Sequence, residues 1–383
     1  MNDFDKALGR VKVLRKVLID YANPTAMKSY NNFYAKLCSY ENLFLAYQKA
    51  RKGKSKKKFI IEFEKNLEQN LRQLQRELIN KAYRPLPLKR FIVRDPKTRV
   101  IHASAFRDRI IHHAIVNILN PIYENVFIYD SYASRIGKGT HLALKRFDFF
   151  KRKVSKNGRL VRIFRANERN SIKGYILKCD IKHYFDTVDH EVLIDILRRK
   201  IKDNSFILLV RNVLDNFDSK CLGKGMPLGN YTSQFFANVY LNEFDYFVKH
   251  ILKARYYMRY VDDFVILHKS RKVLEFHKER IIKYLECLKL EIHPDKSDIL
   301  PLKNGVTFLG YRIFYCYKLL RKRNIKAFNR KFEKILKSYE NKELTKEQII
   351  EQLQGWFGYA QWANTYKFRE EINKRIKEIT TNV

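Results

Sequence analysis

Residues 256–267 read Tyr-Tyr-Met-Arg-Tyr-Val-Asp-Asp-Phe-Val-Ile-Leu, two short apolar runs that meet at a pair of adjacent acids. The runs have the composition of β-strands, and a tight turn between them would bring Asp262 and Asp263 to one place. Carboxylates beside a buried strand are costly to desolvate unless a cation neutralises them, and a divalent metal ion is the natural compensation. Adjacent acids are also common in ordinary turns, so the rest of the chain has to decide.

A third acid ends another apolar run, about eighty residues upstream. Residues 175–179 (YILKC) predict a buried strand, and Asp180 follows it directly. Three carboxylates at strand ends are what two-metal phosphoryl transfer requires. One metal ion lowers the pKa of the attacking hydroxyl, and the other stabilises the leaving pyrophosphate. Asp180, Asp262 and Asp263 are therefore the candidate catalytic and metal-binding acids.

The chain is strongly basic. It has 78 Lys plus Arg against 40 Asp plus Glu, a formal net charge of +38 over 383 residues. An excess spread over the whole length indicates a long polyanion such as nucleic acid, although a Lys-rich, AT-biased genome is the alternative explanation. The length suits two or three lobes packed around a cleft.

Composition also argues against several classes of protein. No CxxC motif or Cys/His cluster supports a disulfide framework or a zinc site. No signal peptide is recognisable, and no apolar run approaches the roughly 18 residues of a membrane span. We therefore expect a soluble, cytoplasmic protein without a membrane partner. The five cysteines are scattered: Cys38, Cys179, Cys221, Cys287 and Cys316.

Two helices are clear from periodicity. Apolar residues recur at three- and four-residue steps from Phe59 to Leu78, which predicts one amphipathic helix, ended by Pro85 and Pro87. Residues 106–128 also read as a helix, broken at Asn120-Pro121.

Strand signals alternate with helical ones. Residues 88–101 predict a hairpin around a turn at 95–97, and residues 306–315 predict a strand pair. Strands interleaved with helices, some joined as hairpins, favour an α+β fold with an antiparallel sheet. The last 65 or so residues are helical and basic, and their aromatic residues would either pack helices or stack bases.

The order of these blocks resembles the reverse transcriptases. Residues 177–186 (LKCDIKHYFD) resemble the family's first palm motif, 226–238 (MPLGNYTSQFFAN) its second, 260–263 (YVDD) its third, and 308–311 (FLGY) its primer grip. The resemblance runs from about Tyr83 to the C-terminus.

A right-hand polymerase fold of fingers, palm and thumb is what this resemblance implies. It assigns residues 1–80 to an N-terminal helical extension and 81–173 to fingers, with a basic hairpin and an insertion near 153–173. Residues 174–315 would form the palm, parts of 191–228 packing with the fingers, and 316–383 a helical thumb.

The family's catalytic roles carry over by matched position. Asp180, Ile181, Asp262 and Asp263 correspond to the residues that bind two Mg²⁺ ions, for which Mn²⁺ would substitute. Lys296, in HPDKSDIL, matches a lysine that would protonate pyrophosphate, although a solvated lysine is nearly as good an explanation.

The resemblance also implies a nucleotide site and a primer grip. Phe185 matches the aromatic steric gate that rejects a 2′-hydroxyl; core packing is the alternative. Arg107 and Arg109 would hold template or form internal ion pairs. The nucleotide-binding residues would be Lys97, Arg99, Phe185, Leu228, Gly229 and Gln234. The primer grip would be Phe308, Leu309, Gly310 and Tyr311.

The second palm motif narrows the resemblance. Most reverse transcriptases carry Gln before the Gly and Pro after the Ser, whereas this chain has Leu228 and Gln234 there. That form resembles the enzymes of diversity-generating retroelements, which copy template RNA into cDNA with errors at adenines. The resemblance implies deoxynucleoside triphosphates and a primer as substrates, and a small basic accessory protein that we expect at the aromatic-rich N-terminal region.

Three other readings remain. Antiphage-defence reverse transcriptases form neighbouring groups that share this motif. An inactive RNA-binding scaffold would have no reason to keep all three acids and Phe185. An RNA-dependent RNA polymerase would favour Gly before the acid pair and a hydrogen-bonding gate residue, and this chain has Val261 and Phe185 instead.

Overall fold

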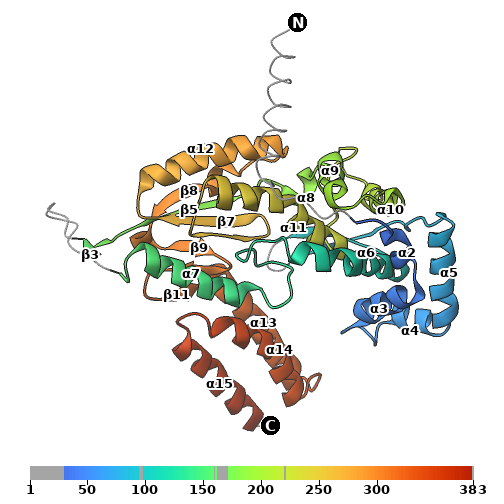
Figure 1. Ribbon diagram of the computed structural model, residues 1–383. Coiled ribbons are helices and arrows are strands. Elements are labelled where there is room, and N and C mark those ends of the chain that lie inside the picture. The colour runs from blue at the N-terminus through green and yellow to red at the C-terminus, as the bar shows by residue number, and fades with distance from the viewer. Residues whose placement is uncertain (1–29, 95–97, 159, 162–170, 220, 382–383) are drawn as a thin grey trace, which may run out of the picture. The chain divides into compact units, whose positions relative to one another are not determined.

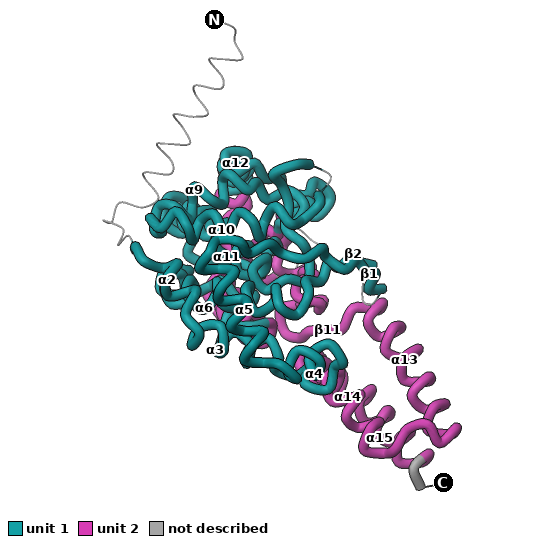
Figure 2. Tube along the Cα trace, turned by 90° about the vertical axis from the view of Figure 1, so that its right-hand side faces the viewer, with its two compact units in different colours: residues 1–139, 179–265, 276–297 teal, residues 140–178, 266–275, 298–383 magenta. Residues whose placement is uncertain are grey.

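The computed structural model forms two compact units (Figure 2). Unit 1 comprises residues 1–139, 179–265 and 276–297, and unit 2 comprises residues 140–178, 266–275 and 298–383. The residues that the structure describes are 30–94, 98–158, 160–161, 171–219 and 221–381.

Helices make up most of unit 1. Helix α11 packs against α6 and α9, and α6 also packs against α3, so these helices form one buried core (Figure 1). A π-helical turn, Phe247–Ile251, continues α11. The bounds are α2 Phe33–Leu37, α3 Tyr40–Arg51, α4 Lys58–Glu64, α5 Leu67–Ile79, α6 Phe106–Glu124, α8 Tyr184–Thr187, α9 His190–Lys200, α10 Asn204–Asp215 and α11 Tyr231–Tyr246.

The helix expected from Phe59 is two helices. Helix α4 ends at Glu64 and α5 begins at Leu67, because Asn66 leaves the helical conformation between them. The proline residues do not end α5 either. The chain leaves the helix at Lys81, whose φ of 56° is left-handed, a common way for a helix to stop.

The break predicted at Asn120-Pro121 is also wrong. Helix α6 runs through Pro121 to Glu124. Proline removes only one backbone hydrogen bond there, near the end of the helix. The last turn is held by Tyr123, a buried ring that packs edge-on against Phe235.

An antiparallel sheet carries the predicted strand pair around the acids. Its strand order within the described residues is β6-β7-β5-β8, and β5 pairs with β8 in antiparallel register from Tyr175↔Pro301 to Lys178↔Asp298. Strands and helices in this arrangement confirm the α+β fold class. The bounds are β5 Tyr175–Asp180, β6 Tyr257–Tyr260, β7 Asp263–His268 and β8 Asp298–Pro301, with helix α12 at Arg271–Cys287 and a 3₁₀ turn at Pro294–Lys296.

The predicted basic hairpin is present. Strands β1 (Lys89–Val93) and β2 (Arg99–Ala103) pair antiparallel, with Val93 opposite Arg99. Every residue of β1 is exposed. Lys97, at the predicted turn, lies outside the described residues.

Unit 2 ends in three helices that pack on one another. Their core contains Phe332, Ile349 and Leu353, and Trp356 stacks on Phe328 with ring centroids 3.5 Å apart. Of the two expected roles, helix packing and base stacking, the Trp356 side chain therefore takes helix packing. The elements of unit 2 are α7 Thr140–Val154, β3 Leu160–Val161, β4 Ser171–Ile172, a 3₁₀ turn Leu302–Asn304, β9 Val306–Phe308, β10 Tyr311–Ile313, β11 Lys318–Leu320, α13 Lys322–Glu340, α14 Lys346–Ala360 and α15 Tyr366–Thr381.

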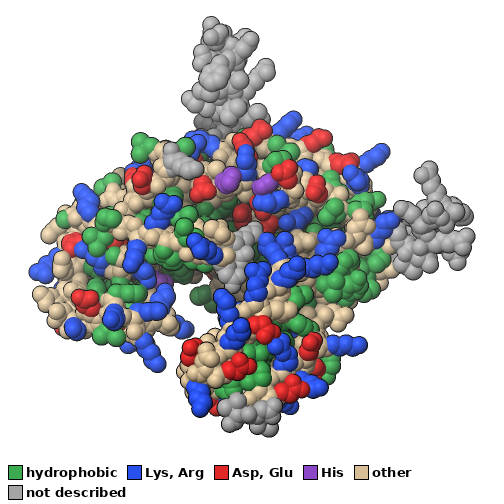
Figure 3. All heavy atoms as spheres, turned by 180° about the vertical axis from the view of Figure 1, so that it is seen from behind, with side chains coloured by type: hydrophobic (Ala, Val, Ile, Leu, Met, Phe, Trp, Pro, Cys, Tyr) green, Lys and Arg blue, Asp and Glu red, His purple; other side chains and the backbone are tan. Residues whose placement is uncertain are grey.

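Lys and Arg side chains are spread over the face seen in Figure 3 rather than gathered in one patch. Such a distribution fits a long polyanion better than a small acidic ligand. Among the described helices, none is both long and apolar enough to cross a membrane.

Candidate active site

The turn that carries the acids is strained. Val261 and Asp262 connect β6 to β7, and Val261 has a φ of 56°. A β-branched side chain rarely adopts the left-handed region, and such a residue costs about 1–3 kcal/mol. Strain of this kind persists only where the surroundings hold the backbone in place.

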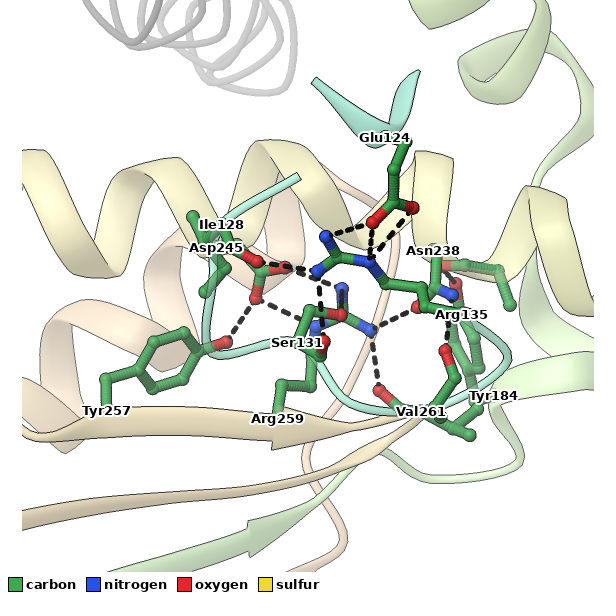
Figure 4. Close-up of polar contacts among 12 residues, drawn as sticks. Glu124, Ile128, Ser131, Arg135, Tyr184, Asn238, Asp245, Tyr257, Arg259 and Val261 are labelled. Atoms are coloured by element: carbon green, nitrogen blue, oxygen red, sulfur yellow. Dashed lines mark hydrogen bonds and ion pairs between the residues drawn. The ribbon is translucent and has the colours of Figure 1, made fainter. Parts of the chain in front are cut away.

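Arg259 holds this turn from inside the protein (Figure 4). Its side chain and that of Asp245 are both 0% exposed, and Nε and Nη2 donate to the two carboxylate oxygens at 2.8 and 2.5 Å. Nη1 donates to the backbone oxygen of Val261 at 3.0 Å. The remaining donors reach Asn238 Oδ1 and Ser131 Oγ, each at 3.2 Å. All five guanidinium donors are thus used, which a buried arginine requires.

The three predicted acids meet at the end of β5. The N–H of Ile181 donates to the backbone oxygen of Asp262 at 3.2 Å, which places the turn against the residue after Asp180. Burial raises the pKa of Asp262 to about 6, and the charges of Asp263 and Asp180 add to this increase. Arg99 acts in the opposite direction. The structure therefore brings all three acids within electrostatic reach of one another.

This donor set suits a divalent ion. Hard cations prefer carboxylate and carbonyl oxygens, and Ile181 could contribute only its backbone carbonyl. The pKa of Asp262 is raised mainly by burial and also by the charges of Asp263 and Asp180, and a cation bound beside these carboxylates would favour their ionised forms. In the part of the chain that the structure describes, no three His, Cys, Asp or Glu side chains already form a metal-binding cluster. The acids and the Ile181 carbonyl therefore match a divalent ion in charge and in the type of donor atom.

Lys296 stands beside these acids. Its Nζ lies 3.7 Å from Asp180 Oδ1. The backbone N–H of His293 donates to the backbone oxygen of Asp180 at 2.7 Å, which fixes the 3₁₀ turn that carries Lys296. The Lys296 side chain is 45% exposed. This geometry allows both a proton donor and a solvated ion pair, so the catalytic role of Lys296 stays a prediction.

A pocket of about 210 Å³ opens in unit 1. It contains five of the six predicted nucleotide-binding residues, and the sixth is Lys97, outside the described residues. Its lining combines apolar side chains with hydroxyl, amide and guanidinium groups. The lining residues are Arg99, Ser134, Phe185, Pro227, Leu228, Gly229, Ser233, Gln234, Asn238 and Val261.

Phe185 and its neighbour Tyr184 have different surroundings. Tyr184 is 2% exposed and its hydroxyl donates to the Ala237 oxygen at 2.8 Å, so this ring belongs to the core. Phe185 is only partly buried and lines the pocket. The alternative of simple core packing therefore describes Tyr184 better than Phe185.

Gly229 allows the pocket loop to approach strand β2. Its φ is 119°, and a Cβ there would lie 2.8 Å from Ile101 Cγ2 and 3.2 Å from the His102 oxygen. The preceding Leu228 accepts a hydrogen bond from His102 N at 2.9 Å through its backbone oxygen. Glycine is thus required by both conformation and space.

Sequence reasoning missed the groups that position this site. Arg259 has a recognisable signal, a lone charge within the apolar run 256–261, whereas Asp245 shares its apolar segment with Glu243. For Arg107 and Arg109, the structure favours internal contacts. The first forms an ion pair with Glu77, and the second donates to the Ser104 oxygen at 2.9 Å.

The predicted primer grip lies in unit 2 at the turn between β9 and β10. Phe308 and Tyr311 are at most 1% exposed, so their side chains serve the core. Leu309 and Gly310 form the partly exposed turn, both with positive φ. Any contact with primer would therefore come from these two residues.

Comparisons with known proteins show the family. Residues 93–313 match the family model described as reverse transcriptase (RNA-dependent DNA polymerase). The chain is 29% identical to protein YkfC of Escherichia coli over 66% of this chain and 72% of that protein. It is 29% identical to the group II intron-encoded protein LtrA of Lactococcus lactis, over 55% of this chain and 33% of LtrA.

Among solved structures, the apo telomerase of Candida tropicalis aligns with a TM-score of 0.48 and 13% identity, over 78% of this chain and 62% of that one. The chain thus spans about a third of LtrA and less than two thirds of that telomerase chain. Because the family model covers more than half of the chain, the protein belongs to the reverse transcriptase family. It is an RNA-directed DNA polymerase by class, with the family's right-hand fold.

The raised pKa of Asp262 predicts a pH-dependent stability. The pKa of Asp262 is about 6 in the folded state against an ordinary value of 3.8, so ionisation of Asp262 destabilises the folded protein fully above pH 6 and has no effect well below pH 3.8. Without metal, Asp262→Asn should raise the free energy of unfolding by up to about 3 kcal/mol at pH 8, and by about half as much at pH 5.

Urea unfolding in EDTA at both pH values measures this. Asp295→Asn, whose parent side chain is 87% exposed, is the matched control and should change little. A destabilised Asp262→Asn at pH 8 would contradict the predicted cost of ionising a buried carboxyl beside two other acids.

Proposed function

We propose that this enzyme copies an RNA template into cDNA with reduced base discrimination, its errors concentrated at template adenines, as in diversity-generating retroelements. The observation that carries the proposal is Leu228 in the wall of the pocket. An aliphatic side chain fills space there but cannot hydrogen-bond to a nucleotide as the usual glutamine would. A lost hydrogen bond of about 0.5–1.5 kcal/mol lowers discrimination by roughly three- to tenfold.

The chain's own groups divide the work at this site. Asp180, Asp262 and Asp263 would hold two Mg²⁺ ions, which supply activation of the primer hydroxyl and stabilisation of pyrophosphate when bound. Arg99 presents a fork-shaped cation that suits the oxygens of a deoxynucleoside triphosphate. Lys296 would donate a proton to the leaving pyrophosphate.

The predicted division into extension, fingers, palm and thumb belongs to the same proposal. Primer and template would be held by the basic surface, with Leu309 and Gly310 at the primer. For the small basic accessory protein, the rings in the described part of the N-terminal region differ in exposure. Phe33 and Tyr47 are buried, whereas Phe44 is 37% exposed.

Phe185 generates the first prediction of this proposal. Phe185→Ala should admit ribonucleotides that the parent rejects, because the ring's bulk at the pocket is the discriminator. Primer extension on RNA with ribo- and deoxynucleotides measures the preference. Phe276→Ala, at a ring 51% exposed on α12, is the control and should leave it unchanged. An unchanged preference in Phe185→Ala would place the gate elsewhere.

The second prediction of this proposal concerns Leu228. Leu228→Gln should lower the error frequency at template adenines by roughly three- to tenfold, because it restores a hydrogen-bonding group to the pocket. Sequencing of cDNA made from a defined RNA measures the errors. Leu208→Gln, at an exposed position of α10, is the matched control. The double substitution Asp262→Asn and Asp263→Asn supplies the inactive reference, with RNA binding retained.

The error spectrum of the parent separates the candidate roles. Errors at adenines support the retroelement type. Accurate cDNA, or errors without adenine bias, would contradict it and favour the antiphage-defence type, with reverse transcription intact. Loss of all synthesis in the parent would contradict both roles and leave an RNA-binding scaffold.

A further inference from the structure

A chain of buried hydrogen bonds joins the start of helix α6 to the start of helix α11. Ser104 Oγ donates to Asn230 Oδ1 at 2.7 Å, and the Ser104 backbone N–H reaches the same oxygen at 3.3 Å. His112 Nε2 lies 2.9 Å from Ser104 Oγ, and His112 Nδ1 lies 2.8 Å from Thr232 Oγ1. The four residues are at most 5% exposed, so water cannot readily replace these bonds.

One arrangement of protons satisfies this chain. Asn230 Oδ1 can only accept, so the Ser104 hydroxyl donates to it and must itself accept from His112 Nε2–H. The other ring nitrogen then accepts from the Thr232 hydroxyl. Burial, more than the neighbouring charges, lowers the pKa of His112 to about 3, so the ring stays neutral near neutral pH.

Both ends of the hydrogen-bond chain adjoin the pocket. Gly229 and Ser233 line the pocket. Asn230 and Thr232, the two ends of the hydrogen-bond chain, lie between them in the sequence. Ser104 directly follows strand β2, whose first residue, Arg99, also lines the pocket. The hydrogen-bond chain therefore connects strand β2, which carries Arg99, to the Gly229–Ser233 segment of the pocket lining.

We propose that this hydrogen-bond chain is a positioning latch, in which His112, held between Ser104 and Thr232, fixes Arg99 relative to the Gly229–Ser233 wall and so sets the affinity for the incoming nucleotide. His112 does not line the pocket and acts through the residues that do. The inference rests on the proposed function, because it needs this pocket to be the nucleotide site. It goes beyond that function by assigning a role to residues outside the family motifs' acids, gate and amide position.

Steady-state kinetics of the full chain on an RNA template test the latch. Thr232→Val keeps the shape of the side chain and removes its hydroxyl, and should raise KM for deoxynucleotides roughly three- to tenfold. KM for primer–template and kcat should each stay within about twofold, because the latch acts on nucleotide placement. Thr232→Ser restores the hydroxyl and should restore KM.

Thr365→Val is the matched control. Thr365 is also buried, at 7% exposure, and its hydroxyl donates to the Ala360 oxygen at 2.7 Å in unit 2. It should leave the nucleotide KM unchanged. An equal KM increase in this control would mean that lost stability explains the effect, and would overturn the latch.

Coupling between two residues of the hydrogen-bond chain, the two that contact His112, gives a second criterion. Ser104→Ala combined with Thr232→Val should raise KM for deoxynucleotides by less than the product of the single effects, because either change alone already interrupts the row of hydrogen bonds. Multiplicative effects would overturn the latch. So would an unchanged KM in Thr232→Val, provided that the parent synthesises DNA. A parent without synthesis would instead contradict the proposed function.

A measurement on the parent protein tests the latch even if the variants fail to fold. Nitrogen-15 spectra of the histidine-labelled chain should show His112 as the neutral Nε2–H tautomer between about pH 6 and 8. A protonated ring or the Nδ1–H tautomer would overturn the proposed proton order and the latch with it.

Discussion

The buried ion pair between Arg259 and Asp245 is the constraint on which the acid cluster depends. It links helix α11, which carries Asp245, to strand β6, which carries Arg259, and it reaches the strained turn through Val261. Tyr257 adds a hydrogen bond to the same carboxylate at 2.5 Å. Removing one partner from such a pair typically costs 3–5 kcal/mol, because the other charge stays buried without compensation. The pair therefore fixes one backbone geometry at the point where two carboxylates must share a site.

The geometry of this site brings the three acids together, whereas burial and the neighbouring charges disfavour ionisation of Asp262. The fixed turn holds Asp262 near Asp180 and Asp263, and burial raises the pKa of Asp262 to about 6, with a further contribution from the two neighbouring charges. Carboxylates that are held close together create affinity for divalent cations, which two-metal phosphoryl transfer requires. The pocket beside the turn shows a similar division of labour. The backbone oxygen of Leu228 accepts a hydrogen bond from His102 N, while the Leu228 side chain lines the pocket.

The sequence was enough to predict the α+β class and the reverse transcriptase family, and both are confirmed. It also predicted five residues that the structure gathers in one pocket, although their roles remain predictions. It did not predict the partners of Arg259, because a buried charge shows in sequence as a lone polar residue and its contacts are set by folding. Local rules failed where packing overrode them. Helix α6 passes Pro121, and Asn66 divides a continuous apolar stripe into two helices.

The most direct test of this account is the Mn²⁺ affinity of Arg259→Lys, measured by electron paramagnetic resonance and compared with that of the parent. Lysine keeps a positive charge opposite Asp245 but has three donors in place of five, so it cannot make every bond that holds Val261. The account predicts that the folded variant binds Mn²⁺ roughly ten- to a hundredfold more weakly, as for other groups that orient metal ligands. An affinity equal to that of the parent would contradict it, because the acids would then form their site without the buried pair.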